Sequence, residues 1–235
     1  MADAIQIKKE IIMKRLIKYL IWVVFIVPAI YLAIIWNDLP EKIPMRYNLK
    51  GEVKLYGGKT ELLILIGIVT VINIGVYFLL ANINRIDPKK KYSEENLPRM
   101  KRLAFAVSIF ISAIACFILY SCQHDEMKLN PKFIVVGIGL LFTVIGNYFY
   151  TIKPNYFAGL RTPWALESEE NWRLTHKLGG KLWFAGGLLL AIVGLFLNNT
   201  ALFIVLMLTI LIMVAVPIVY SYRLYAKTKN NLPDK

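Results

Sequence analysis

The sequence of 235 residues is 57% hydrophobic and only 18% charged, whereas soluble globular chains average about 45–50% and about 25%. Its hydrophobic residues fall in long uninterrupted runs, which excludes a soluble enzyme domain, a disordered chain and a collagen-like chain. In a soluble protein, the formal net charge of +13 would suggest nucleic-acid binding. In a membrane protein it matches the Lys and Arg excess of cytoplasmic loops. We therefore expect the lipid bilayer as a partner and no direct contact with nucleic acid.

Six hydrophobic segments are long enough to cross a hydrocarbon layer of roughly 30 Å, which predicts an all-α integral membrane protein with six transmembrane helices. Basic residues precede the first segment, as in a signal peptide, but no small-residue cleavage site follows it, so we interpret it as an uncleaved helix. Only three residues separate the last two segments, which predicts a tight helical hairpin. The predicted spans are 19–36, 62–81, 103–121, 133–150, 182–197 and 201–220.

The distribution of basic residues predicts the orientation in the membrane. Of the 28 Lys and Arg residues, 21 fall in the N-terminus, in the loops after spans two and four, and in the C-terminal tail, and seven fall on the opposite side. Cytoplasmic loops carry the excess of Lys and Arg. Both termini are therefore expected in the cytoplasm, while segments 37–61, 122–132 and 198–200 are expected to face outward.

The interior of the predicted spans contains no Asp, Glu, Lys, Arg or His near a midpoint. Transporters coupled to ions or protons usually place an ionisable residue there, because a charge in the bilayer is costly unless it is used. This pattern argues against a coupled transporter but leaves open a path for a neutral solute. Asn73 and Asn147 are expected to form hydrogen bonds between helices.

The outer loop after the first span has a period of two. Apolar residues alternate with polar ones from Ile43 to Lys50, Gly51 supplies a turn, and the alternation resumes at Val53. This pattern predicts a small extracytoplasmic β-hairpin. The hairpin could be a cap that ties two helices together, or a recognition surface for a molecule arriving from outside. The candidate residues of that surface are Pro44, Arg46, Tyr47, Asn48, Gly51, Tyr56 and Lys59.

The inner loop, residues 151–180, predicts a cytoplasmic amphipathic helix between transmembrane helices 4 and 5. Thr162-Pro163 is typical of a helix start, and Ser168 can cap a second helical segment. Trp172 and His176 are then four residues apart and share one helix face. Gly179-Gly180 is expected to end this helix before the fifth span. A helix with Trp on one side and basic residues on another suits the lipid headgroup layer.

No set of nucleophile, base and orienting group occurs in the sequence, nor a phosphate-binding loop, so we expect no enzymatic activity and no catalytic residues. His176 and His124 lack partners at the spacing of metal ligands, so no metal or other cofactor is expected. We interpret His176 as a hydrogen-bonded interfacial histidine, although a chemical role stays open. Arg161 is expected to bind lipid phosphates or a loop carboxylate.

Two motifs resemble known modules. The first is Gly159-Leu-Arg-Thr-Pro-Trp-Ala-Leu166, followed by Ser168-Glu-Glu-Asn-Trp172, His176 and Gly179-Gly180, and it resembles the signature of the bacterial SdpI family. The outer loop is similar to a small domain of unknown function that often precedes that module. It departs from that pattern at Arg46, Lys54 and Tyr56, where His, an acidic residue and Trp are usual. The resemblance divides the chain into residues 1–100 with outer loop 37–61, and a four-helix module at 101–235 with inner loop 151–180.

The resemblance implies a non-enzymatic membrane immunity or signalling protein of the bacterial cytoplasmic membrane. Such a protein gives resistance to a secreted antimicrobial peptide toxin and sequesters a transcriptional repressor at the membrane. The alternative is a permease or efflux component for a small or amphipathic solute. If Arg161, Trp172 and His176 form an accessible docking or gating surface, alanine at these positions would spare folding. The alternative is a structural role, in which Arg161 holds the loop to lipid headgroups and Trp172 anchors the helix at the interface. The inner-loop residues that match the family motif are Asn155, Gly159, Arg161, Thr162, Pro163, Trp164, Trp172, His176 and Gly180.

Overall fold

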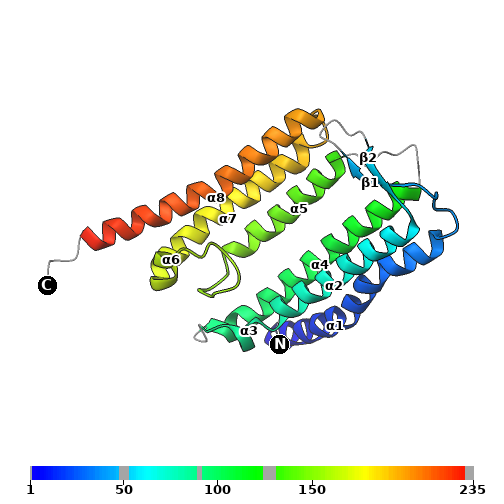
Figure 1. The fold of residues 1–235 in the computed structure, drawn as a ribbon. Helices are drawn as coiled ribbons and strands as arrows, with labels where there is room; N and C mark the ends of the chain where they lie inside the picture. Colours follow the sequence, from blue (N-terminus) through cyan, green and yellow to red (C-terminus); the bar gives the residue numbers. More distant parts are fainter. Residues whose placement is uncertain (1, 48–52, 89–91, 124–130, 231–235) are drawn as a thin grey trace. The chain divides into compact units, whose positions relative to one another are not determined.

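The computed structural model describes residues 2–47, 53–88, 92–123 and 131–230 (Figure 1). Two short strands and eight helices make up this part of the chain. In chain order they are α1 (Ala2–Ile35), β1 (Ile43–Tyr47), β2 (Val53–Gly57), α2 (Lys59–Ala81), α3 (Ile83–Ile86), α4 (Ser93–Gln123), α5 (Pro131–Phe149), α6 (Pro163–Glu167), α7 (Glu169–Val193) and α8 (Asn199–Asn230).

Four helical segments of the described residues are long and apolar enough to cross a membrane: 59–81, 94–123, 132–149 and 199–230. A shorter apolar helix covers 19–35. These segments coincide with five of the six predicted spans and agree with a helical multi-pass membrane protein. The predicted fifth span corresponds to the second half of α7, where Lys177 and Lys181 precede a short apolar run.

The chain folds into two compact units. The first contains described residues 2–47, 53–77 and 105–123, and the second contains 78–88, 92–104 and 131–230. Helices α2 and α4 each contribute to both units. The module boundary predicted between residues 100 and 101 therefore falls inside α4, and it stays a prediction.

The first unit is held together by an apolar core and by one polar cluster. The Asn73 side chain donates hydrogen bonds to the Ser108 carbonyl (3.2 Å) and to the Ser112 hydroxyl (3.0 Å), and Ser112 donates to the Val24 carbonyl (2.7 Å). Helices α1, α2 and α4 are thereby joined in an apolar setting, so the interhelical role predicted for Asn73 is confirmed. Asn147 is instead exposed. The core residues are Leu32, Ile35, Leu39, Ile43, Leu62, Ile66, Ala115, Leu119 and Cys122.

The predicted hairpin is present. Strands β1 and β2 pair antiparallel, with Ile43 opposite Gly57 and Tyr47 opposite Val53, and with an irregular register around Arg46. Ile43 is fully buried in the core of the first unit, whereas Arg46 is exposed. The hairpin is therefore anchored at one end by apolar packing. The turn residues, including Asn48 and Gly51, lie outside the described residues.

In the second unit, α5, α7 and α8 run side by side (Figure 1). The contact of α5 with α7 depends on small residues. A Cβ on Gly146 would lie 2.4 Å from the Phe184 backbone nitrogen, and a Cβ on Gly187 would lie 2.5 Å from the Gly139 carbonyl oxygen. Only glycine permits this approach of two helix backbones, which is a typical device of helix packing in membranes.

One prediction about the helices of this unit is wrong. The amphipathic helix is not separate from the fifth span, because α7 runs without a break from Glu169 to Val193. Gly179 and Gly180 are buried against Leu160 and Gly146, so tertiary packing outweighs their low helix propensity of roughly 1 kcal/mol each. Asp87, after α3, and Asn96, in the first turn of α4, are both buried.

Candidate functional site

The inner loop begins its helical part with two capped helix starts, as predicted. The Thr162 hydroxyl accepts a hydrogen bond from the Ala165 amide (3.3 Å), with Pro163 in the first turn of α6. The Ser168 hydroxyl accepts from the Asn171 amide at the start of α7 (3.2 Å). Each cap satisfies an amide that the helix cannot satisfy itself. The caps fix the corner between α6 and α7.

Trp172 and His176 share one helix face, as predicted, but that face is buried. Trp172 is 2% exposed and His176 is 1% exposed. Their rings stack with centroids 3.9 Å apart, and the Trp172 indole N–H donates to the Ile152 carbonyl (2.8 Å). The prediction that both side chains lie on an accessible surface is therefore wrong. The loop between α5 and α6 folds back over this face of α7, where Ile152 and Leu160 contact the two rings.

The imidazole of His176 holds the loop at residues 159–160. Its Nδ1–H donates to the Trp172 carbonyl (2.9 Å), and its Nε2 accepts from the Leu160 amide (3.0 Å). These contacts require the neutral ring protonated on Nδ1. Gly159 lies beside the ring with φ of 103°, and a Cβ there would lie 2.3 Å from Nε2. Glycine is thus required at 159 both for its backbone conformation and for space.

Burial lowers the pKa of His176 to about 4, and the hydrogen bond to the Trp172 carbonyl opposes this shift in part. His176 precedes the apolar half of α7. Its unfolded-state pKa is near 6.5, so the unfolded chain binds more protons between about pH 6.5 and pH 4. The neutral ring therefore contributes stability that is complete above pH 6.5 and falls as the pH drops.

We expect acidification from pH 6.5 toward pH 4 to lower the free energy of unfolding by at most about 1.4 kcal/mol per pH unit through His176. Melting temperatures of the detergent-solubilised protein, measured across this range, check the prediction. The control is His176→Gln, which has no titrating ring and should show a flatter pH dependence. An equal slope in both proteins would contradict the assignment.

Two asparagines shape the segment that leads into the loop. Asn96 pairs with the backbone of Lys153, donating to its carbonyl (3.1 Å) and accepting from its amide (2.9 Å). Asn155 donates to the same carbonyl (2.9 Å) and accepts from the Phe157 and Ala158 amides. Both side chains are fully buried or nearly so. The motif residue Asn155 therefore folds the loop, and Asn96, which belongs to α4, fixes its start.

A second buried polar cluster joins α6, α7 and α8. The Asn171 amide donates to the Ser221 carbonyl (2.9 Å), and its oxygen accepts from the hydroxyls of Ser221 (2.6 Å) and Thr175 (3.0 Å). The Thr162 hydroxyl lies 3.2 Å from that of Ser221. Trp164 packs against Tyr222 and Tyr225 of α8, completing the contact. Asn171, Thr175 and Ser221 were not singled out from sequence, although polar residues beside apolar stretches were a usable signal.

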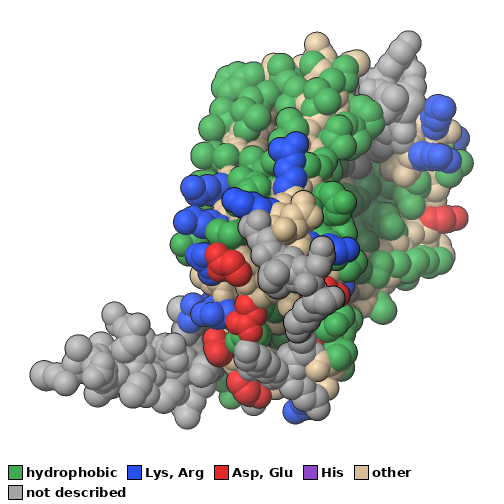
Figure 2. All heavy atoms as spheres, turned by 90° about the vertical axis from the view of Figure 1, so that its left-hand side faces the viewer, with side chains coloured by type: hydrophobic (Ala, Val, Ile, Leu, Met, Phe, Trp, Pro, Cys, Tyr) green, Lys and Arg blue, Asp and Glu red, His purple; other side chains and the backbone are tan. Residues whose placement is uncertain are grey.

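The accessible part of the inner loop carries charges of both signs. Arg161 and Pro163 are exposed, and the Arg161 guanidinium donates to the Tyr156 carbonyl. Arg173 is exposed and forms an ion pair with Glu170 (2.6 Å). Figure 2 shows Lys and Arg side chains gathered at the border of a broad hydrophobic surface.

A cavity of about 540 Å³ opens at the inner loop, with Trp172 and His176 among its lining residues. The other lining residues are Tyr92, Arg99, Tyr150, Thr151, Ile152, Lys153, Pro154, Glu169, Glu170, Arg173 and Lys177.

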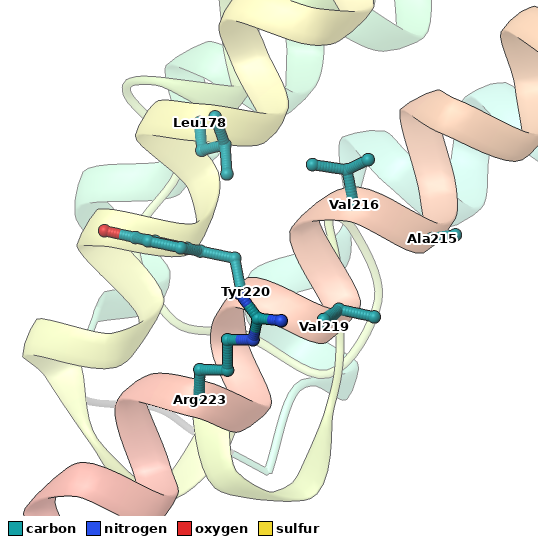
Figure 3. A pocket seen from close by; sticks show the side chains of 6 residues that line it. All are labelled: Leu178, Ala215, Val216, Val219, Tyr220 and Arg223. Atoms are coloured by element: carbon teal, nitrogen blue, oxygen red, sulfur yellow. The ribbon is translucent and has the colours of Figure 1, made fainter.

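A second, smaller cavity of about 300 Å³ lies between α7 and α8 (Figure 3). Its walls are mainly apolar, from Leu178 on α7 and from Val216 and Val219 on α8, and Tyr220 and Arg223 stand beside them. Among the described residues, no group of three His, Cys, Asp or Glu side chains could hold a metal ion. Charged and apolar side chains thus line the two cavities at this end of the second unit.

The outer-loop candidates occupy different environments. Tyr56 is 56% exposed, and its neighbour Leu55 is 57% exposed. Lys59 is half-buried and donates to the Trp36 carbonyl (2.8 Å), so it ties α2 to the end of α1. Pro44 is half-buried opposite Tyr56. The exposed part of the hairpin thus combines Leu55 and Tyr56 with the cation Arg46.

Comparison with known proteins finds matches for the regions that contain both motifs. Residues 151–221 match the SdpI/YfhL protein family, and residues 23–70 match a domain of unknown function, DUF1648. The chain is 22% identical over 196 residues to the immunity protein SdpI of Bacillus subtilis (strain 168), and this similarity covers 83% of the present chain and 88% of that protein. No solved structure matches the chain. The resemblance indicated by the motifs is therefore confirmed: the match to DUF1648 precedes the match to the SdpI/YfhL family along the chain.

Proposed function

We propose that this protein is a non-enzymatic membrane immunity protein that gives resistance to a secreted antimicrobial peptide toxin. The observation that carries the proposal is the similarity to the immunity protein SdpI across nearly the full length of both chains. The two family matches include the outer hairpin and the inner loop, the two parts of the chain that extend beyond plain helix connections. The membrane is the cytoplasmic membrane of a bacterium, and both termini lie in the cytoplasm because the basic residues concentrate on that side.

The exposed residues of the hairpin, which lie on both faces of β2, form the surface that meets the toxin. Leu55 and Tyr56 present apolar area that is not used in the core, and Arg46 lies opposite Leu55 in the register. Exposed apolar and aromatic side chains next to a cation are typical of protein-binding hot spots. Ile43 at the other end of the same strand is buried, so the hairpin is held in place while its far side stays available.

The cytoplasmic partner, a small transcriptional repressor, docks on the accessible part of the inner loop. That part contains Arg161, Pro163 and Tyr156, all of which are exposed. The buried members of the family motif, such as Trp172 and Asn155, shape the loop that presents these three residues. Toxin resistance and repressor sequestration would thus use different segments of the chain, the outer hairpin and the inner loop.

The test uses one outer and one inner variant. Leu55→Ser combined with Tyr56→Ser should weaken protection about thirtyfold, since loss of hot-spot contacts costs about 2 kcal/mol or more. Arg161→Ala should keep protection but reduce the recruitment of a repressor to membranes. Survival of a sensitive bacterial strain, challenged with secreted peptide toxins, measures protection, and co-sedimentation with membranes measures recruitment.

Ile43→Ala is the control for a purely structural hairpin, because it removes buried area and leaves the exposed side unchanged. It should lower membrane abundance and melting temperature, whereas the Leu55 and Tyr56 substitutions should leave both near wild type. Full protection by the double variant would overturn the assignment of the outer surface. A wild-type chain that gives no strain any protection would overturn the proposed function itself.

A further inference from the structure

A groove between α5 and α7 joins cationic and apolar surface. Its volume is about 330 Å³, and its lining residues are Gly146, Asn147, Tyr150, Lys177, Gly180, Lys181 and Phe184. At the bottom of the groove, Gly146 of α5 and Gly180 of α7 lie in close contact, so the floor consists of backbone atoms. The other lining residues form the rim with their side chains. It carries two cations and no carboxylate.

The cations stand at one end of a stripe along α7. Arg173, Lys177 and Lys181 follow at intervals of four residues and are all exposed, so they lie on one side of the helix. Arg173 is already paired with Glu170. The next residues on this side of α7 are Phe184 and Leu188, which are 45% and 43% exposed.

The side of α7 at the groove therefore changes from basic to apolar within two turns, at the point where the predicted fifth span begins. A ligand that matches this order has an anionic group at one end and a long apolar chain at the other. Flexible lysine side chains hold phosphate as point charges, and exposed apolar side chains beside a backbone floor suit an acyl chain. Charge complementarity favours an anionic lipid over a zwitterionic one, because cations outnumber carboxylates in the lining of the groove and of the cavity next to it, and this surplus repels an ammonium group.

We propose that this groove binds one anionic phospholipid, with its phosphate between Lys177 and Lys181 and one acyl chain lying along Phe184 and Leu188. Tyr150 lines both this groove and the neighbouring cavity of about 540 Å³. The headgroup extends past Tyr150 into that cavity, whose lining has two carboxylates, Glu169 and Glu170, and a surplus of cations from Arg99, Lys153, Arg173 and Lys177. This inference does not depend on toxin resistance, and its test does not measure protection.

The test measures lipid binding to the full-length protein in detergent micelles by native mass spectrometry, with phosphatidylglycerol as the probe. Lys177→Gln combined with Lys181→Gln should weaken binding about thirtyfold, from the contribution of two basic residues to the attraction of an anionic lipid. The matched control is Lys227→Gln with Lys229→Gln, which makes the same change of charge on exposed positions of α8. The control should change the affinity less than twofold.

A further variant separates a lipid from a free anion. Asn147 is exposed on the groove, so Asn147→Trp should fill the space for the acyl chain without disturbing the core, which an unchanged melting temperature would establish. It should weaken phosphatidylglycerol binding about tenfold, equivalent to the loss of a few apolar contacts. Excess inorganic phosphate should not displace the lipid.

Three outcomes would overturn the proposal. Equal affinity for phosphatidylcholine and phosphatidylglycerol would show that Lys177 and Lys181 do not select the anionic lipid. An equal loss of affinity in the α8 control would show that only total charge matters. Unchanged binding in Asn147→Trp, together with displacement of the lipid by inorganic phosphate, would assign the groove to a free anion.

Discussion

Replacing Gly146 by alanine should destabilise the second unit by about 3 kcal/mol or more, the upper part of the range for overpacked sites. The added Cβ would lie 2.4 Å from the Phe184 nitrogen, 2.8 Å from the Trp183 carbonyl carbon and 2.9 Å from the Gly180 carbonyl oxygen. All three are backbone atoms of α7, so no side chain can rotate away. The two helices would have to separate, which would also disturb the packing at Gly139 and Gly187. Membrane abundance and the melting temperature in detergent measure the effect.

Gly75→Ala is the matched control for this substitution. Gly75 also lies inside an apolar helix, α2, but a Cβ there meets nothing within 4 Å. Alanine has a helix propensity about 1 kcal/mol better than glycine, so this variant should equal or exceed the wild type in stability. If both variants lower the melting temperature by the same amount, the loss comes from glycine replacement in general and the close approach of α5 and α7 is not its cause.

Trp172→Ala should cost about 3–5 kcal/mol, the range for removing a large buried aromatic side chain. The substitution removes the ring that stacks on His176, leaves a cavity beneath the loop, and deprives the Ile152 carbonyl of its indole donor. Most of the inner loop should lose its order as a result. This expectation reverses the one drawn from sequence, in which alanine at Trp172 would spare folding. Thermal unfolding in detergent and protease sensitivity of the loop measure the change.

Two companion variants divide the effect into its parts. Trp172→Phe keeps an aromatic ring and loses the hydrogen bond, so it should cost clearly less than alanine does. Arg161→Ala removes an exposed side chain from the same loop and should change the free energy of unfolding by less than about 0.5 kcal/mol. Equal stability of Trp172→Ala and Arg161→Ala would contradict the buried role of the indole.

The elements that could be predicted from sequence are those with a strong local pattern. Long apolar runs identified the membrane helices, alternation from Ile43 onward identified the hairpin, and Thr162 and Ser168 identified two helix starts. The spacing of Trp172 and His176 correctly placed them on one face. The spacing could not show that this face is buried, because the loop that covers it is packed there only in the folded protein.

The errors share one physical cause, which is that tertiary contacts decide what a local pattern leaves open. Gly179-Gly180 reads locally as the end of a helix, yet close packing against α5 keeps α7 continuous. Asn96 reads locally as part of a polar connector, yet it pairs with the backbone of Lys153, which is distant in the sequence. Neither partner can be identified without the fold, so neither role could be predicted from the residues alone.

The continuity of α7 has a mechanical consequence. A helix of 25 residues is about 37 Å long at 1.5 Å per residue, and its Gly179-Gly180 pair, where a helix could kink, is packed against Leu160 and Gly146. Its first turns carry the stacked rings that hold the inner loop, and its last turns contact α8. A rotation of α7 about its long axis would therefore turn Trp172 and Gly187 through the same angle. The inner loop and the packing of the apolar half are thus attached to one continuous helix, so a movement of α7 would reposition both.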